Sequence, residues 1–369
     1  MKIQKIAAAA ALTALATPIF AQSGVTIYGS FDQYYNHLSS SSGAKVNSLE
    51  DGSFLRSRLG FRGTEDLGGG YAAKFQLEMG IAGNSGAPAD ATRGFDRQTW
   101  VGMATPYGEF RAGRQNTIIF FRGDYVDFTS RTLGSVVNAF GVPSRFDNDL
   151  SYQSPRIAGF QFDAHYALGT PADVNNQSIA QLGVDYLNGP VRVGYANLAA
   201  KAPKNAVVAQ DVKYENYYAN YDYGRGKIYA VYIKTNNTTA SGGLNNGGTI
   251  LGNVGGVVAG TNTEAKNFYE ITQLSADYKL TEALRLGGLV GQIKDTSGNG
   301  KNAKGFDLGA YYDLSKRTML SAHVHQLAND PNAGFRPSGS AGLKGTFTSA
   351  ADVNGQTIKG FYAGIVHRF

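Results

Sequence analysis

Apolar and polar side chains alternate with a period of two along most of this chain. In the stretch 160–168, for example, Phe162 and Tyr166 alternate with Asp163 and His165. Successive side chains of a β-strand point to opposite faces, so this pattern predicts strands with one apolar and one polar face. The same alternation recurs in the segments 25–32, 55–62, 71–79, 182–186, 284–290, 306–312 and 320–324.

Two segments depart from the simple alternation. Residues 229–233 are apolar on both faces. The apolar phase also shifts between Tyr269-Ile271 and the following 274–278, which predicts a β-bulge between them.

The connections between the predicted strands alternate in length. Short turns are predicted at 65–70, 105–109, 154–159, 187–190, 222–227, 280–283 and 314–317. Longer Ser-, Asn- and Gly-rich stretches separate them, at 39–52, 83–96, 116–144, 169–177, 200–212, 236–266, 295–303 and 328–356. This order predicts sixteen strands, with both chain ends on the short-turn side. Outer-membrane barrels have an even strand number, short periplasmic turns and long outer loops.

The composition narrows the fold class. The 369 residues include 48 Gly, 22 Tyr, 20 Phe and no Cys, so no disulfide framework is available. After residue 21, no apolar run approaches the roughly 20 residues of a membrane helix. A secreted all-β sandwich or solenoid has a similar composition, but a sandwich would not enforce the alternation of short and long connections. We therefore predict an all-β, sixteen-stranded antiparallel transmembrane barrel, whose size leaves a water-filled lumen.

Both ends of the chain carry targeting features. Lys2 and Lys5 precede an apolar run and a small residue at Ala21, which predicts a signal peptide at 1–21 and a barrel domain at 22–369. Removal of the two lysines lowers the formal net charge from +6 to +4. The final strand, 361–369, ends on Phe369 and resembles the signal by which barrel-insertion machinery recognises its clients.

Four motifs carry a resemblance to a known family: Val25-Thr26-Ile27-Tyr28-Gly29 and the segments 57–68, 108–115 and 363–369. In these motifs the chain resembles the general porins of β-proteobacteria, over essentially its whole mature length. The resemblance implies a homotrimer of sixteen-stranded barrels in the Gram-negative outer membrane, with the third outer loop (116–144 here) folded into the lumen. It implies passage of small hydrophilic solutes and ions. The implied partners are further copies of the chain, outer-membrane lipid and lipopolysaccharide, and the barrel-assembly machinery.

Basic residues dominate the predicted lumen face. Arg56, Arg58 and Arg62 share the polar face of one predicted strand. Because rings of charge set ion preference in pores and guanidinium stays protonated, we expect a fixed positive wall. The candidates for the basic wall of the constriction are Arg56, Arg58, Arg97, Arg111 and Arg145, and the other lumen candidates are Asp32, Lys74, Arg192 and Arg285.

The opposite wall is expected from the third loop. Asp124 and Asp127 lie there among several aromatic residues, and in resembling porins acids of this loop face a basic wall. Alternatively, these carboxylates cap turns of their own loop, and the arginines only neutralise inward-facing acids. Since bases outnumber acids on the wall, we expect mild anion preference.

Other functions have weaker support. A substrate-selective channel for small anions or organic acids on the same barrel is the main alternative. A barrel hydrolase would need a fragment such as Ser321 with His323, two residues apart on one face. A structural adhesin is a further alternative. We expect no catalysis and no cofactor or metal. We also expect no nucleic-acid partner, because the basic residues point into a pore.

Overall fold

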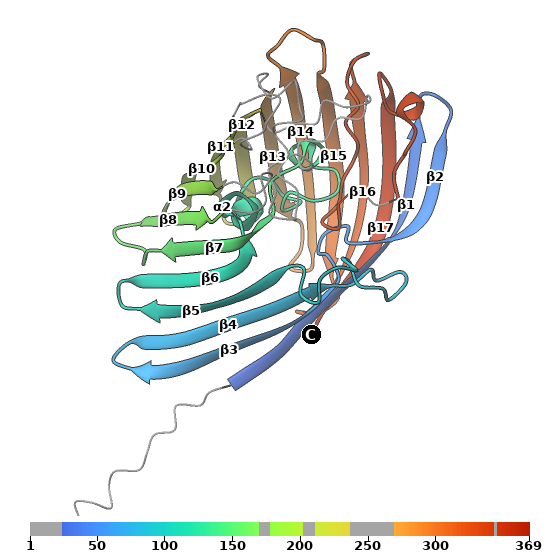
Figure 1. The fold of residues 1–369 in the computed structure, drawn as a ribbon. Helices are drawn as coiled ribbons and strands as arrows, with labels where there is room; N and C mark the ends of the chain where they lie inside the picture. The colour runs from blue at the N-terminus through green and yellow to red at the C-terminus, as the bar shows by residue number, and fades with distance from the viewer. Residues whose placement is uncertain (1–23, 170–177, 202–210, 237–268, 343–344) are drawn as a thin grey trace, which may run out of the picture.

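The computed structural model describes residues 24–169, 178–201, 211–236, 269–342 and 345–369, and its strands form one continuous antiparallel sheet. Each strand pairs with its sequence neighbour, except that β2 and β3 both pair with β1. β1 also pairs with β17, from Ser30 opposite Arg368 to Ser40 opposite Ile358, which closes a barrel (Figure 1). The predicted signal peptide, 1–21, lies outside the described residues. The strands are β1 (Gly24–Ser40), β2 (Lys45–Asp51), β3 (Arg58–Gly68), β4 (Tyr71–Gly80), β5 (Gln98–Thr105), β6 (Gly108–Asn116), β7 (Arg145–Gln153), β8 (Phe160–Ala167), β9 (Ile179–Asn188), β10 (Val191–Ala200), β11 (Val212–Asp222), β12 (Lys227–Thr235), β13 (Tyr269–Lys279), β14 (Leu284–Asp295), β15 (Ala303–Asp313), β16 (Thr318–Asn329) and β17 (Thr357–Arg368).

The second strand of the barrel is broken. Both β2 and β3 pair with β1. β3 pairs with residues 24–30 of β1 and β2 with residues 33–39, and residues 52–57 separate β2 from β3. The barrel therefore has sixteen strand positions, as predicted. The prediction of a loop at 39–52 is wrong, since β1 and β2 are joined by a tight turn at 41–44. Residues 39–52 lie at the ends of these two strands. We infer that both faces of the wall meet water there, so the strands do not need alternating apolar and polar side chains.

The other connections follow the predicted order. Short turns join β3 to β4, β5 to β6, β7 to β8, β9 to β10, β11 to β12, β13 to β14 and β15 to β16. Most residues of the loops predicted near 169–177, 200–212 and 236–266 lie outside the described residues.

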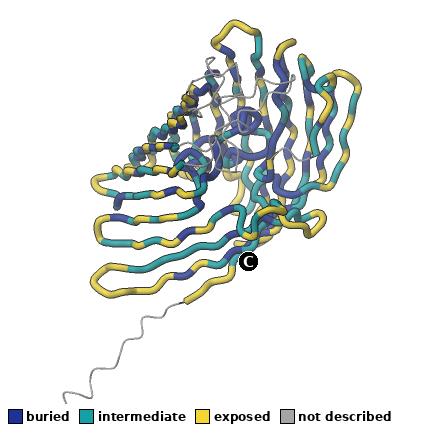
Figure 2. Tube along the Cα trace, viewed as in Figure 1, coloured by how far each residue is buried: buried dark blue, intermediate teal, exposed yellow. Residues whose placement is uncertain are grey.

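The outer face of the barrel is apolar and exposed. Val25, Ile27, Val101 and Val290 are each more than half exposed, as lipid-facing positions should be. Along the strands, exposed residues alternate with more buried ones, and buried residues also gather inside the barrel (Figure 2).

The two irregular segments have a different cause from the one predicted. β13 keeps an unbroken register with β12 and with β14, so the predicted bulge is absent from this described strand. Instead Val231, Ile233 and Ile271 are buried on the inner face, in one hydrophobic cluster with residues of the third loop. Part of the inner wall is apolar because a protein segment covers it.

That segment is the third loop, residues 117–144, which folds into the barrel (Figure 1). It contains α2 (Ile118–Phe121), the 3-10 turn η1 (Arg122–Tyr125) and α3 (Val136–Phe140), and a further 3-10 turn, η4 (Ala350–Asp352), lies in the last loop. The side chains of Thr117 and Ser135 cap α2 and α3. None of the helices in the described part of the chain has the length and apolarity needed to cross a membrane.

Candidate functional site: a constriction inside the barrel

Two arginines on the barrel wall surround a buried carboxylate. The Nε of Arg97 lies 2.6 Å from Oε1 of Glu78, and Nη1 of Arg58 lies 3.8 Å from Oε2 of the same residue. Glu78 is on β4, with Arg58 at the start of β3 and Arg97 just before β5. One carboxylate thus faces two guanidinium groups, so this part of the wall keeps a net positive charge.

Arg56 is placed by the break in the second strand rather than by strand parity. The carboxylate of Asp32 on β1 accepts hydrogen bonds from the backbone N–H groups of Phe54 (2.7 Å) and Leu55 (2.6 Å), and from the hydroxyl of Ser53 (2.9 Å). These bonds attach the segment to β1, and the ring of Phe54 lies 5.3 Å from that of Tyr311 on β15. Asp32 is therefore fully buried and fixes the backbone beside Arg56, which corrects the expectation that Asp32 faces the open lumen.

The third loop is anchored to the opposite wall by a buried arginine. Arg122 forms an ion pair with Asp163 on β8, and its Nη1 donates to the Tyr218 hydroxyl on β11 at 2.6 Å. Its Nη1 also lies 3.9 Å from Asp185 on β9. Removing one partner from such a buried pair is costly, because the remaining charge is left unpaired away from water.

Asp127 holds the loop's own turn. Its carboxylate accepts hydrogen bonds from the backbone N–H groups of Thr129 (2.9 Å) and Arg131 (2.8 Å), from Ser135 (2.7 Å) and from Gln273 on β13 (2.7 Å). The residue is 1% exposed. The expectation that Asp127 faces the arginine wall is therefore wrong, and the capping alternative describes its contacts.

Arg131 of the loop and Arg145 of β7 both stack on Phe120. Their guanidinium carbons lie 4.5 Å and 4.7 Å from the centre of the Phe120 ring. Both arginines are buried, and burial lowers the pKa of the Arg131 guanidinium from its ordinary value. Nε of Arg131, and Nε and Nη2 of Arg145, have no hydrogen-bond partner among the described residues. Both residues contribute to the lining of the cavity described below, so their positive charges act on an anion that enters it.

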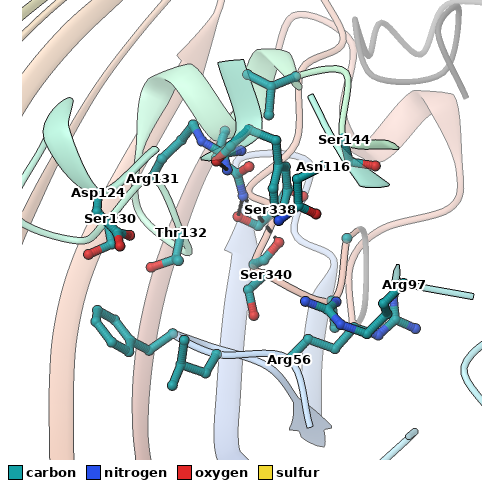
Figure 3. A pocket seen from close by; sticks show the side chains of 18 of the residues that line it. Arg56, Arg97, Asn116, Asp124, Ser130, Arg131, Thr132, Ser144, Ser338 and Ser340 are labelled. Atoms are coloured by element: carbon teal, nitrogen blue, oxygen red, sulfur yellow. Dashed lines mark hydrogen bonds between the residues drawn. The ribbon is translucent and has the colours of Figure 1, made fainter. Parts of the chain in front are cut away.

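The wall and the loop enclose a cavity of about 690 Å³ (Figure 3). In this view Asp124 and Ser130 lie at one side and Arg97 at the other, with Arg56 below. Asp124 is the one carboxylate among the lining residues that the structure describes, whereas six arginines contribute to the lining. These arginines are Arg56, Arg58, Arg97, Arg131, Arg145 and Arg368.

The remaining predicted lumen residues lie elsewhere, paired with acids. Arg111 and Lys74 both bind Glu109, at 2.5 Å and 2.7 Å, and neither lines the cavity. Arg192 pairs with Asp185 at 3.0 Å, and Arg285 pairs with Asp277 at 3.0 Å. For these four residues the structure shows the neutralising contacts of the alternative interpretation. The structure thus brings four of the five predicted wall arginines together and separates Arg111 from them.

Sequence reasoning missed three contributors to the cavity. Arg131 lies in the predicted third loop, and its charge in that inward loop could have marked it as a candidate. Arg368 has the inward parity of β17 and could have been found from it. The segment 338–342 of the last loop also lines the cavity, and no periodicity signals it.

The hydrolase fragment is not assembled as a catalytic site. The His323 imidazole is fully buried between the rings of Phe128 and Tyr362, and its Nδ1 contacts Asp307 at 2.8 Å. The Ser321 hydroxyl has no hydrogen-bond partner among the described residues, so it is not activated by His323. Within the described ranges, no three His, Asp or Glu side chains come together as a metal site.

A closed sixteen-stranded barrel with an apolar outer face, an inward loop and a charged constriction defines the class of outer-membrane β-barrel channels. The sequence comparisons identify the family. The family profile described as Gram-negative porin matches residues 8–332, so the chain belongs to the Gram-negative porins.

Curated relatives match most of the chain. An outer membrane porin protein of Bordetella pertussis is 29% identical over 86% of this chain and 92% of its own length. The major outer membrane protein P.IB of Neisseria meningitidis is 28% identical over 91% of this chain and 98% of its own. The chain is thus an outer-membrane porin of the Gram-negative type.

Solved structures share the fold. An anion-selective porin from Comamonas acidovorans superposes with a TM-score of 0.74 at 23% identity, covering 94% of this chain and all of that one. The trimer form of OmpT from Vibrio cholerae gives a TM-score of 0.64 at 17% identity, over 94% of this chain and 99% of that one. At these identities the likeness concerns the fold.

Proposed function

We propose that this porin is a water-filled pore for the passive diffusion of small hydrophilic solutes, with a preference for anions. The observation that carries the proposal is the charge of the constriction, where six arginines and one aspartate line the cavity. Lumen charges at close range generate potentials of several kT, which concentrate counter-ions at the narrowest point. The Comamonas acidovorans porin, which shares the fold, is anion-selective, and this supports the same sign here.

We further propose how the chain is targeted and assembled. Residues 1–21 are removed as a signal peptide, and 22–369 form the barrel. The barrel functions as a homotrimer in contact with outer-membrane lipid and lipopolysaccharide, after insertion by the barrel-assembly machinery. The trimer form of the Vibrio cholerae OmpT structure supports the trimeric state. The protein is a channel and not an enzyme, in agreement with the buried, stacked imidazole of His323.

Liposome swelling tests the proposal with solutes of similar size and opposite charge. Liposomes containing the folded protein should swell faster in isotonic glutamate than in isotonic lysine, with a neutral sugar between them. Equal rates for glutamate and lysine would contradict the anion preference. The absence of swelling with every solute would contradict the pore.

A specific observation favours a substrate-selective channel for small anions or organic acids as the second candidate. Arg131 and Arg145 stack on the Phe120 ring and line the same cavity as Arg97, so several fixed positive charges surround one space in which an oxyanion can bind. A pore with such a site conducts that anion with saturation, because passage is limited by an occupied site. Conductance that stays proportional to anion concentration would exclude this second candidate.

A further inference from the structure

The last loop, between β16 and β17, also enters the barrel. Phe335 is fully buried, with its ring 5.8 Å from Phe140 of α3 and 6.1 Å from Tyr269 of β13. The base of the loop is fixed by Asn329 at the end of β16. Its Nδ2 donates to the carbonyl of Phe335 at 3.0 Å, and its Oδ1 accepts from the Phe335 N–H at 2.9 Å. The path of residues 335–342 is therefore determined by buried packing and hydrogen bonds.

The tip of this segment is attached to both sides of the constriction. On the loop side, Nδ2 of Asn138 in α3 donates to the carbonyls of Ser338 and Gly339, the latter at 3.1 Å. On the wall side, the N–H of Ser340 donates at 2.8 Å to the carbonyl of Gly52. Gly52 begins the break in the second strand that carries Arg56. The segment thus bridges from the third loop to the wall beside the arginines.

Close backbone contacts fit the segment to the wall. A Cβ at Gly339 would lie 2.6 Å from the carbonyl oxygen of Gly52, and a Cβ at Gly52 would lie 2.8 Å from the Cβ of Ala341. Gly52 also has a φ of +78°, which disfavours a side chain there. Gly339 and Gly52 therefore both need to be glycine, as expected where the last loop packs closely against the wall.

We propose that residues 335–342 form a second constriction element, and that Asn138 couples this element to the third loop. The cavity-lining part, 338–342, carries no charge, so it narrows the water path without opposing the arginines. The opening is then set jointly by the two loops, and loss of the Asn138 contact widens it. The inference rests on the proposed pore function and adds a determinant of its size limit.

The cysteine-free chain allows a direct test. In Ser340→Cys, a methanethiosulfonate reagent added to a planar bilayer should lower the conductance in steps, because the added group enters the water path. An anionic reagent should react faster than a cationic one. The two reagents differ by two charges, so a local potential of only about one kT makes the anionic reagent react roughly sevenfold faster than the cationic one.

Asn332→Cys is the matched control. Asn332 is in the same loop but exposed, and its Nδ2 donates to the carbonyl of Asn299 at 2.9 Å. Its modification should leave the conductance unchanged. Complete labelling of Ser340→Cys without a loss of conductance, or failure of folded Ser340→Cys to react, would overturn the proposal. The reversal potential of the unmodified channel in the same bilayer reports separately on the proposed pore function.

The coupling role of Asn138 has its own comparison. Asn138→Ala removes the amide that joins the two loops and should raise single-channel conductance or produce rapid closures. Asn332→Ala removes an amide of the last loop outside the constriction and should do neither. Indistinguishable currents from the two variants would refute the coupling.

Discussion

Charge reversal at Arg56 tests how the constriction produces selectivity. Arg56 lines the cavity and is placed there by backbone contacts of the neighbouring residues, and no ion pair involving it is found in the described chain. Arg56→Glu therefore changes the charge of the wall by two units without breaking a salt bridge. The barrel strands and the third loop should remain in place.

The size of the effect follows from the volume of the cavity. Treated as a sphere, 690 Å³ corresponds to a radius of about 5.5 Å, at which one wall charge in water shifts the energy of a central monovalent ion by about 0.75 kcal/mol. The substitution changes two charge units, and these act with opposite sign on an anion and a cation. The difference in free energy between the two ions in the constriction therefore changes by about 3 kcal/mol. Screening over a Debye length of about 8 Å halves this, which leaves roughly a tenfold loss of anion preference.

The assay is the reversal potential in a planar bilayer, with Arg62→Glu as the matched variant. Arg62 is exposed on β3 and does not line the cavity. It lies about 13 Å from Arg58 along the strand, which exceeds the Debye length. Its reversal should therefore change the permeability ratio much less. Equal shifts from the two variants would refute the assignment of Arg56 to the constriction.

Three further changes test the anchoring of the loop and the closure of the barrel. Arg122→Ala leaves the buried Asp163 carboxylate without its cationic partner, at a cost of about 3–5 kcal/mol to the loop's attachment, and should increase open-channel noise. An unaltered current would contradict the anchor. Asp127→Ala removes hydrogen bonds worth about 1–3 kcal/mol each and should raise single-channel conductance, whereas unchanged conductance would show that the turn holds without it. Deletion of Phe369, whose backbone exchanges two hydrogen bonds with Gly29, should reduce the yield of folded barrel on heat-modifiability gels, and a normal yield would speak against a role of this residue in insertion.

The wall of the barrel could be predicted from sequence because lipid imposes a simple pattern. Wherever one face meets lipid and the other carries polar side chains, as in β8, alternation is strict and the strand is found. Where the inner face meets protein, as at Val231 and Ile271, the pattern fails and suggests an irregularity that does not exist. The prediction also fails at the polar strand ends around residues 39–52, for the opposite reason: we infer that both faces of the wall meet water there.

The candidate site was only partly predictable. Parity identifies inward charges but not their partners, so Arg111 and Arg58 appear equivalent in sequence although one binds Glu109 and the other lines the cavity. The positions of Arg56 and Asp127 depend on hydrogen bonds between segments far apart in the chain. The inward course of 335–342 depends on packing of Phe335 against α3, which no local pattern encodes.

The reversal potential of the wild-type protein under a potassium chloride gradient tests the central claim most directly. Stepwise conductance with a reversal potential of the sign for chloride permeation is the predicted result. A potential of the sign for potassium permeation would contradict the account, because it would mean that Asp124 and other lumen acids outweigh the six arginines of the constriction.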